Sequence, residues 1–299
     1  MQPEPDFTSE APARHPFDRL TAREIVLACL LGMIPGVILA AVGGSRAASA
    51  PGPIVAYLGV AVAVAGWAHL RGVRLGAVIG RRPSGRELLV AFGLGITLLL
   101  FSFGSLVALL GVLSIAIPGI LEQTSANSPR LLVLDEGRID FVSTFLLGGA
   151  VALAAPIVEE LVFRGLLFTR WGRRFGIVRG LVFSALLFGL LHFALQPLGA
   201  LGLGFVAGLL YLRTRSLLVP LVTHATVNGT IFAATVLAHD SSILTPEMPG
   251  ADELRGLVAV GVVLVLVTTP ILVHLLMRWW PAPGAVLPYD ANTDGGRGE

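Results

Sequence analysis

Three charged side chains stand in the middle of a long apolar stretch of this sequence. Glu159 and Glu160 are adjacent, and Arg164 follows in the otherwise almost entirely apolar segment 145–168. A charged side chain at the centre of a bilayer costs about 2.5–3.5 kcal/mol on insertion scales, so ionisable groups inside a membrane segment indicate function. This cluster is therefore the first candidate site.

The spacing of the cluster separates the roles of the two glutamates. Residues i and i+4 are neighbours on a helix, and an acid that precedes its base has the better orientation, so we expect Glu160 to pair with Arg164. Glu159 points about 100° away around the helix and lacks that partner. A carboxylate without a countercharge is suited to accept a proton from water, so Glu159 is the candidate general base.

Two later apolar segments carry further polar side chains at helical spacing. His192 follows Phe188 by four positions, and His224 and Asn228 are also four apart, on one face of a helix. At 1.5 Å of rise per residue, Glu159 and these three polar residues lie roughly 12–21 Å from the predicted inner ends of their segments. That depth is the middle of a hydrocarbon core about 30 Å thick. We predict one shared site near the bilayer midplane.

Composition identifies the segments as membrane spans. The 299 residues are 55% hydrophobic and 13% charged, with a mean hydropathy of +0.82, whereas soluble domains carry about 25% charged residues. Several apolar runs exceed the roughly 18 residues that indicate a transmembrane helix. We expect an all-α fold, a polytopic membrane helical bundle of about eight transmembrane helices. The expected spans are 24–44, 53–70, 87–118, 141–169, 178–195, 198–213, 216–238 and 256–279.

The arginines predict how the bundle lies in its membrane. All 21 basic residues are arginine, and they gather at the ends of the spans instead of forming a patch with aromatic residues, which argues against a nucleic-acid partner. With the N-terminus inside, sixteen arginines fall in inner segments and four in outer ones. This asymmetry predicts a multi-pass protein of the cell (cytoplasmic) membrane with both termini cytoplasmic. The single cysteine, Cys29, cannot form an intrachain disulfide.

The charged motifs, taken together, resemble a known family. Three motifs occur in order on three predicted spans: Glu-Glu-x-x-x-Arg at 159–164, Phe-x-x-x-His at 188–192 and His-x-x-x-Asn at 224–228. Each motif alone is short, but the ordered set at one depth is specific, and it resembles the CAAX prenyl protease and bacteriocin-processing (CPBP) family of intramembrane endopeptidases. The resemblance covers residues 143–236.

The resemblance implies a hydrolase that cuts membrane-associated proteins or peptides. The roles that it implies are water activation by Glu159 and His192, support by Glu160 and Arg164, and oxyanion stabilisation by His224 and Asn228. The chain then divides into a disordered cytoplasmic tail (1–22), N-terminal transmembrane helices (24–140), a CAAX-protease-like catalytic core (143–236), a final transmembrane helix (256–279) and a disordered tail (281–299).

The cofactor is left open by the sequence. Members of the resembled family are often described as metalloproteases, and Glu159, His192 and His224 supply the ligand types of a single zinc ion. The chain has no His-Glu-x-x-His pair, however. We prefer a water molecule activated by glutamate and histidine without a cofactor, with a zinc site as the alternative.

Two other classes of function remain as alternatives to an enzyme. A non-catalytic immunity or scaffold protein of the same fold would not need this complete polar set, given its insertion cost. An ion-coupled transporter also uses intramembrane glutamate and histidine, but transporters commonly have paired inverted halves, and the first three spans hold no matching groups. The expected partners are a membrane-associated protein or peptide substrate and the lipid bilayer. The composition, rich in Arg, Ala, Gly and Val, looks bacterial, so prenylated CAAX proteins are not the expected native substrate.

Overall fold

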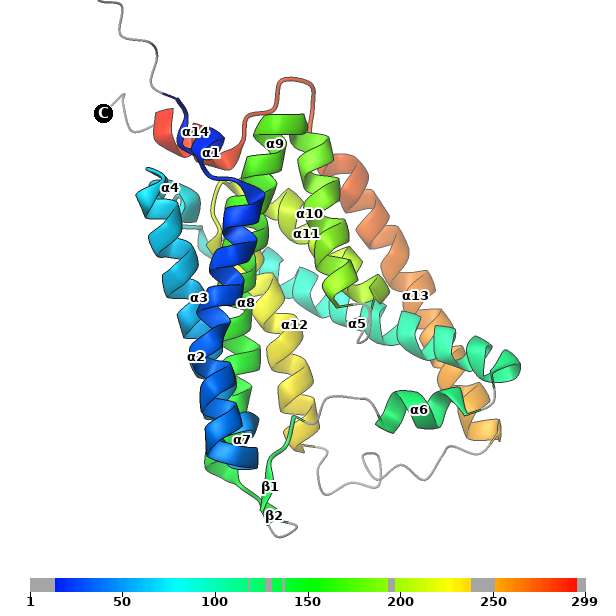
Figure 1. Ribbon diagram of the computed structural model, residues 1–299. Coiled ribbons are helices and arrows are strands. Elements are labelled where there is room, and N and C mark those ends of the chain that lie inside the picture. Colours follow the sequence, from blue (N-terminus) through cyan, green and yellow to red (C-terminus); the bar gives the residue numbers. More distant parts are fainter. Residues whose placement is uncertain are drawn as a thin grey trace, which may run out of the picture.

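The computed structural model is a bundle of apolar helices and describes residues 14–117, 119–126, 131–135, 138–192, 197–237 and 251–294 (Figure 1). Within this part of the chain, six helices are long and apolar enough to cross a membrane, and two more are apolar but shorter. The long ones are α2 (Ala22–Ser49), α3 (Pro51–Leu70), α5 (Gly85–Ala116), the continuous rod Phe141–Phe175, α12 (Leu218–Leu237) and α13 (Ala251–Trp279), and the shorter ones are α10 (Ile177–Leu191) and α11 (Pro197–Thr214). These helices coincide with the eight predicted spans, so the prediction of a polytopic all-α membrane bundle is confirmed.

Short sequence signals fix where several helices begin. Thr21 and Glu24 form a capping box at the start of α2, and Ser84 and Glu87 form another at the start of α5. In each, a hydroxyl and a carboxylate accept hydrogen bonds from backbone N–H groups that have no partner within the helix. Asp140 caps the long rod by accepting a bond from the Ser143 backbone N–H at 3.1 Å.

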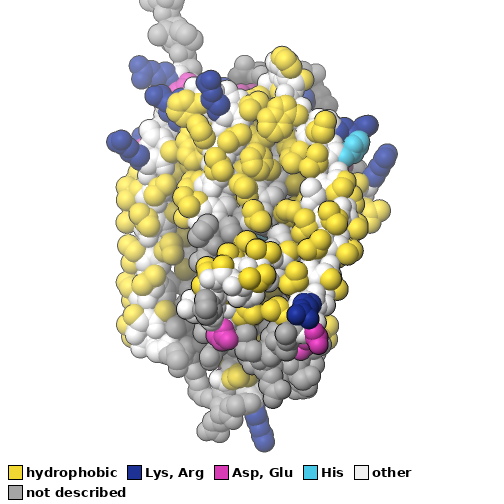
Figure 2. All heavy atoms as spheres, turned by 90° about the vertical axis from the view of Figure 1, so that its right-hand side faces the viewer, with side chains coloured by type: hydrophobic (Ala, Val, Ile, Leu, Met, Phe, Trp, Pro, Cys, Tyr) yellow, Lys and Arg dark blue, Asp and Glu magenta, His cyan; other side chains and the backbone are white. Residues whose placement is uncertain are grey.

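The surface has the distribution of side chains that a membrane protein needs. Figure 2 shows a broad apolar belt on one face, with charged side chains gathered toward the two ends of the molecule. Exposed side chains of α13, such as Leu266 and Val267, are apolar and more than half accessible. Apolar surface of this extent is not left facing water in soluble proteins, so the belt is suited to lipid.

One end of the bundle collects the connections that carry most of the arginines. Three short helices lie there: α1 (Pro16–Arg19), α4 (Leu75–Ile79) and α14 (Pro288–Asp294) (Figure 1). We call it the α14 end. The opposite end carries α6 (Ile120–Ala126) and a small hairpin of β1 (Leu134–Asp135) and β2 (Arg138–Ile139). The predicted assignment of the α14 end to the cytoplasm remains a prediction.

Both predicted tails contain folded residues. Phe17 in α1 is fully buried and Tyr289 in α14 is 2% exposed, and their rings meet edge to face at a centroid distance of 4.9 Å. The expectation of disorder is therefore wrong for residues 14–20 and 281–294, because a few aromatic and apolar side chains in these polar segments pack against each other and the bundle. Residues 1–13 and 295–299 lie outside the described residues.

A polar cluster accompanies this aromatic contact. His15 accepts a hydrogen bond from the Phe17 N–H through Nδ1 at 3.2 Å, while its Nε2 lies 3.1 Å from Asp290. Asp290 also pairs with Arg173 at 3.1 Å. Burial, reinforced by the charge of Arg173, lowers the pKa of His15 below its ordinary value, although Asp290 and Asp18 act in the opposite direction.

The long rod is the element that positions the charged cluster. It consists of α7 (Phe141–Gly149), the π-helical segment η1 (Ala150–Ala154), α8 (Ala155–Glu160), the π-helical segment η2 (Leu161–Phe168) and α9 (Thr169–Phe175). The π-helix is rare and is frequent at functional sites. The two glutamates therefore end a short α-helical segment between two π-helical ones. Helix α10 packs on η2, and α12 packs on η1 and α8.

Candidate active site

Helices α8, α10 and α12 bring Glu159, His192 and His224 together. The Glu159 Oε2 atom lies 3.7 Å from the Nε2 atom of His192 and 3.7 Å from the Nε2 atom of His224. These separations exceed a hydrogen bond. Oε2 is buried and has no hydrogen-bond partner among the described residues. The carboxylate thus faces both imidazoles without being neutralised by either.

Glu160, the next residue along the helix, occupies a different environment. Its side chain and that of Arg164 are each 1% exposed. Glu160 Oε1 accepts a hydrogen bond from Arg164 Nη1 at 2.8 Å and lies 2.9 Å from the His224 Nδ1 atom. The structure therefore contains the expected Glu160–Arg164 pair and adds His224 as a second partner, which the sequence did not reveal.

These contacts indicate which ring nitrogen carries the proton in the neutral form of each histidine. An ionised carboxylate only accepts hydrogen bonds, so His224 Nδ1 carries the proton that it shares with Glu160. The His192 Nδ1 atom lies 2.8 Å from the Phe188 carbonyl oxygen, which also only accepts. In the neutral rings both Nε2 atoms therefore present lone pairs toward Glu159 Oε2. Three acceptors converge on one point, and the arrangement requires a donor or a cation between them.

Phe188 packs against three of the surrounding polar side chains. Its ring stacks on that of His192 at a centroid distance of 4.4 Å and meets that of His224 edge to face at 5.6 Å. The Arg164 guanidinium lies 4.4 Å from the same ring centroid, within cation–π range. The sequence identified Phe188 only as a motif position. Its four-residue spacing from His192 was the signal that could have indicated this contact.

Asn228 lies on the same helix as His224 but contacts a different part of the rod. Its Nδ2 donates to the Val151 carbonyl of η1 at 3.0 Å. No hydrogen bond joins it to Glu159, His192 or His224 in the described residues. Its predicted role at an oxyanion remains a prediction, for which one of its two amide N–H bonds is left.

A residue that sequence reasoning missed supports the second π-helical segment. The Ser184 hydroxyl of α10 is buried and donates to the Phe163 carbonyl of η2 at 2.8 Å. With the Asn228–Val151 bond, each π-helical segment receives one side-chain donor from a neighbouring helix. In the sequence, the signal for this contact was a single small polar residue, Ser184, within an apolar span. Such donors satisfy backbone groups that irregular helix leaves free.

Glu159, His192 and His224 have the chemical types of metal ligands. Two imidazoles and a carboxylate form a common zinc ligand set. In the described part of the chain, however, no group of three His, Cys, Asp or Glu side chains is arranged to hold a metal ion.

Comparison with known proteins identifies the middle of the chain. Residues 141–230 match a family model described as type II CAAX prenyl endopeptidase Rce1-like. No match was found among curated proteins, and none among solved structures. The matched region includes all three motifs and all six predicted site residues, and it confirms the resemblance to the CAAX protease family. The chain is therefore a multi-pass helical membrane protein whose residues 141–230 are similar to type II CAAX prenyl endopeptidase Rce1-like proteins.

Proposed function

We propose that the protein is an intramembrane endopeptidase that hydrolyses a peptide bond of a membrane-associated protein or peptide. The observation that carries the proposal is the convergence of Glu159 Oε2 with the Nε2 atoms of His192 and His224, each at 3.7 Å. A water molecule is a natural occupant of a gap between acceptors that are too far apart to bond directly. Its two O–H bonds satisfy two of the three acceptors, and its oxygen is the nucleophile.

The proposed reaction begins with Glu159 as general base. Glu159 takes one proton from the water while the water oxygen bonds to the scissile carbonyl carbon, whose π electrons move to oxygen as the oxyanion. The C–N bond then breaks, and the leaving nitrogen receives the proton from Glu159. The products are a carboxylic acid and an amine, so atoms and charge balance without another reactant.

The remaining groups orient this reaction. Glu160 accepts the hydrogen bond from His224 Nδ1–H and so fixes the tautomer in which the Nε2 lone pair accepts one O–H bond of the attacking water. His192 is 29% exposed at its side chain, the highest value among these groups, and thus stands where substrate arrives. Arg164 is too deeply buried to meet substrate and holds the Glu160 carboxylate in place by direct contact. We place this site near the bilayer midplane of a bacterial cell membrane, with both termini cytoplasmic.

The test compares membrane peptides in cells that carry wild-type protein or Glu159→Gln. Glutamine fills the same volume but cannot take the water proton, so we expect peptide-bond cleavage to fall by roughly 10²–10⁴-fold, with normal insertion and thermal stability. Glu253→Gln, which changes an exposed glutamate at the start of α13, is the matched control and should behave like wild type. Near-normal turnover by purified Glu159→Gln would remove Glu159 from its assigned role.

A further inference from the structure

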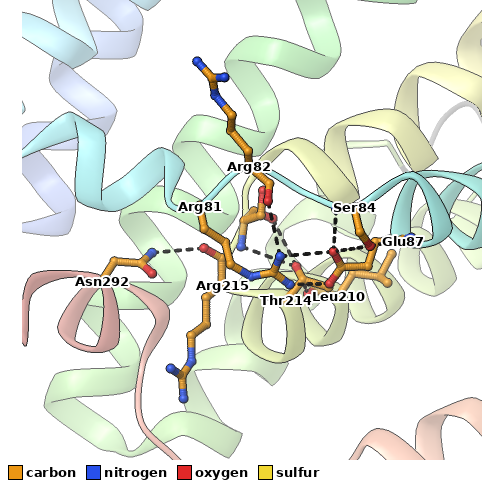
Figure 3. Close-up of polar contacts among 9 residues, drawn as sticks. Arg81, Arg82, Ser84, Glu87, Leu210, Thr214, Arg215 and Asn292 are labelled. Carbon is orange, nitrogen blue, oxygen red and sulfur yellow. Dashed lines mark hydrogen bonds and ion pairs between the residues drawn. The ribbon is translucent and has the colours of Figure 1, made fainter. Parts of the chain in front are cut away.

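Helix α14 forms hydrogen bonds to α4 and to the turn between α11 and α12 at the α14 end. The Asn292 side-chain Nδ2 donates to the Ala77 carbonyl at 2.9 Å and to the Arg215 carbonyl at 3.0 Å. Figure 3 shows this amide reaching Arg215, beside the Arg81–Glu87 pair that begins α5. Asn292 therefore joins α4 to the turn between α11 and α12.

The same helix also contacts the N-terminal end of α4. The Tyr289 hydroxyl accepts a hydrogen bond from the Arg74 N–H at 3.2 Å, and Arg74 caps α4 without any side-chain bond of its own. Helix α4 has only five residues, far below the length at which a helix is stable alone. Its position therefore depends on what packs against it, and α14 supplies one polar group to its N-cap residue and another to the carbonyl of its middle residue.

Helix α4 presses directly on the segment that carries Arg164. Val78 is fully buried, and its Cγ1 lies only 2.7 Å from where a Cβ on Gly165 would stand. Because residue 165 is a glycine, Val78 can pack directly against η2. The Val78 carbonyl in turn accepts a bond from the Tyr211 hydroxyl of α11 at 2.7 Å, which fixes the wedge from a second side.

From these contacts we infer that Asn292 is a positioning residue for the active site. Acting through α4 and Val78, it keeps η2 in the conformation that holds Arg164 against Glu160, and thereby holds Glu160 against His224. A π-helical segment has a regular α-helical alternative that rotates the residues after it, so a lateral wedge is needed to favour one form. This inference rests on the proposed peptidase function for its kinetic readout only.

The test uses two neighbouring substitutions in the full-length protein. Asn292→Asp keeps the shape but removes both N–H donors. Thr293→Ala is the control, because among the described residues the Thr293 hydroxyl bonds only the Asp290 carbonyl, within α14 itself. With a peptide that spans the cleavage site found in the membrane comparison, we expect Asn292→Asp to lower kcat about 2- to 30-fold, the range of couplings transmitted through packed elements. KM should not change, because α14 packs on α4 and α11 and a change in positioning alone alters the chemical step.

Hydrogen exchange tests the same inference without any substrate. Amides of 75–79 and 161–168 should exchange faster in Asn292→Asp and at the wild-type rate in Thr293→Ala. Val78→Ala, which removes the wedge but leaves α14 intact, should accelerate exchange in η2 and lower kcat in the same way. Faster exchange confined to α4, with η2 and kcat unchanged, would overturn the inference. A wild-type protein that cleaves nothing would instead refute the proposed function, and exchange in η2 would then decide the positioning role alone.

Discussion

Removing the Glu160 carboxylate should destabilise the protein far more than changing Glu159. Glu160 Oε1 has two charged or polar partners, Arg164 at 2.8 Å and His224 at 2.9 Å. Glu160→Ala removes both interactions at once and leaves the Arg164 guanidinium buried, in contact with the Leu203 carbonyl at 3.4 Å and the Phe188 and Phe163 rings. None of these contacts carries a compensating negative charge.

The magnitude follows from two independent routes. Removing one partner of a buried ion pair costs about 3–5 kcal/mol. Two hydrogen bonds to a charged group, at about 1.5–3 kcal/mol each, give about 3–6 kcal/mol. We therefore expect Glu160→Ala to lose about 3–5 kcal/mol. The double variant Glu160→Leu with Arg164→Met should recover much of that loss, because no uncompensated charge remains in it.

Unfolding of purified protein in detergent, for Glu160→Ala, Glu160→Leu, Arg164→Met and the double variant, measures these differences. Glu159→Gln is the matched control and should keep wild-type stability, since its Oε2 has no partner to lose. Two results would refute the reasoning. One is a Glu160→Ala protein within about 1 kcal/mol of wild type, well below the cost of a stranded buried charge. The other is a double variant as unstable as the sum of its single changes.

Three further predictions concern pH, metal and orientation. The lowered pKa of His15 makes folding favour its neutral form, so thermal stability should be full above its unfolded-state pKa of about 6.5 and should decline as pH falls below it. His15→Asn, which keeps a capping acceptor, should flatten that decline. If the water site works without metal, purified protein should contain substoichiometric zinc, and His224→Ala should lose activity without any change in metal content; stoichiometric zinc lost with His224 would favour the zinc alternative. Reporter fusions after residue 175 should read cytoplasmic and those near residue 128 external, and the reverse result would invert the proposed orientation.

Much of the fold and part of the site could be predicted from the sequence. Continuous apolar runs are a one-dimensional signal, so the eight helices lie where hydropathy placed them. The Glu160–Arg164 contact is also local, because four residues are one helical turn. The grouping of Glu159 with His192 and His224 followed from comparing depths along three spans, a measure that needs only helical rise.

The rest depends on rotation and packing, which a single sequence does not specify. The bond between His224 and Glu160 requires that α12 turn its Nδ1 toward α8, and the same helix turns Asn228 toward Val151. Hydropathy assigns depth but not this rotation. The tails were misjudged for a related reason: their few anchors, such as Phe17 and Tyr289, are too sparse to register against the surrounding proline, glycine and charged residues.

The shortness of α10 has a consequence for how the reaction obtains its water. Its 15 residues, Ile177–Leu191, span about 22 Å, less than a hydrocarbon core of about 30 Å, so in the proposed placement the helix ends before it reaches the far side. The last carbonyl groups of any helix have no intrahelical donors, and inside a membrane such groups are tolerated only beside protein or water. A helix that stops at this depth therefore favours hydration of the bilayer interior around its end. This hydration would supply water, the reactant of the proposed hydrolysis that lipid normally excludes.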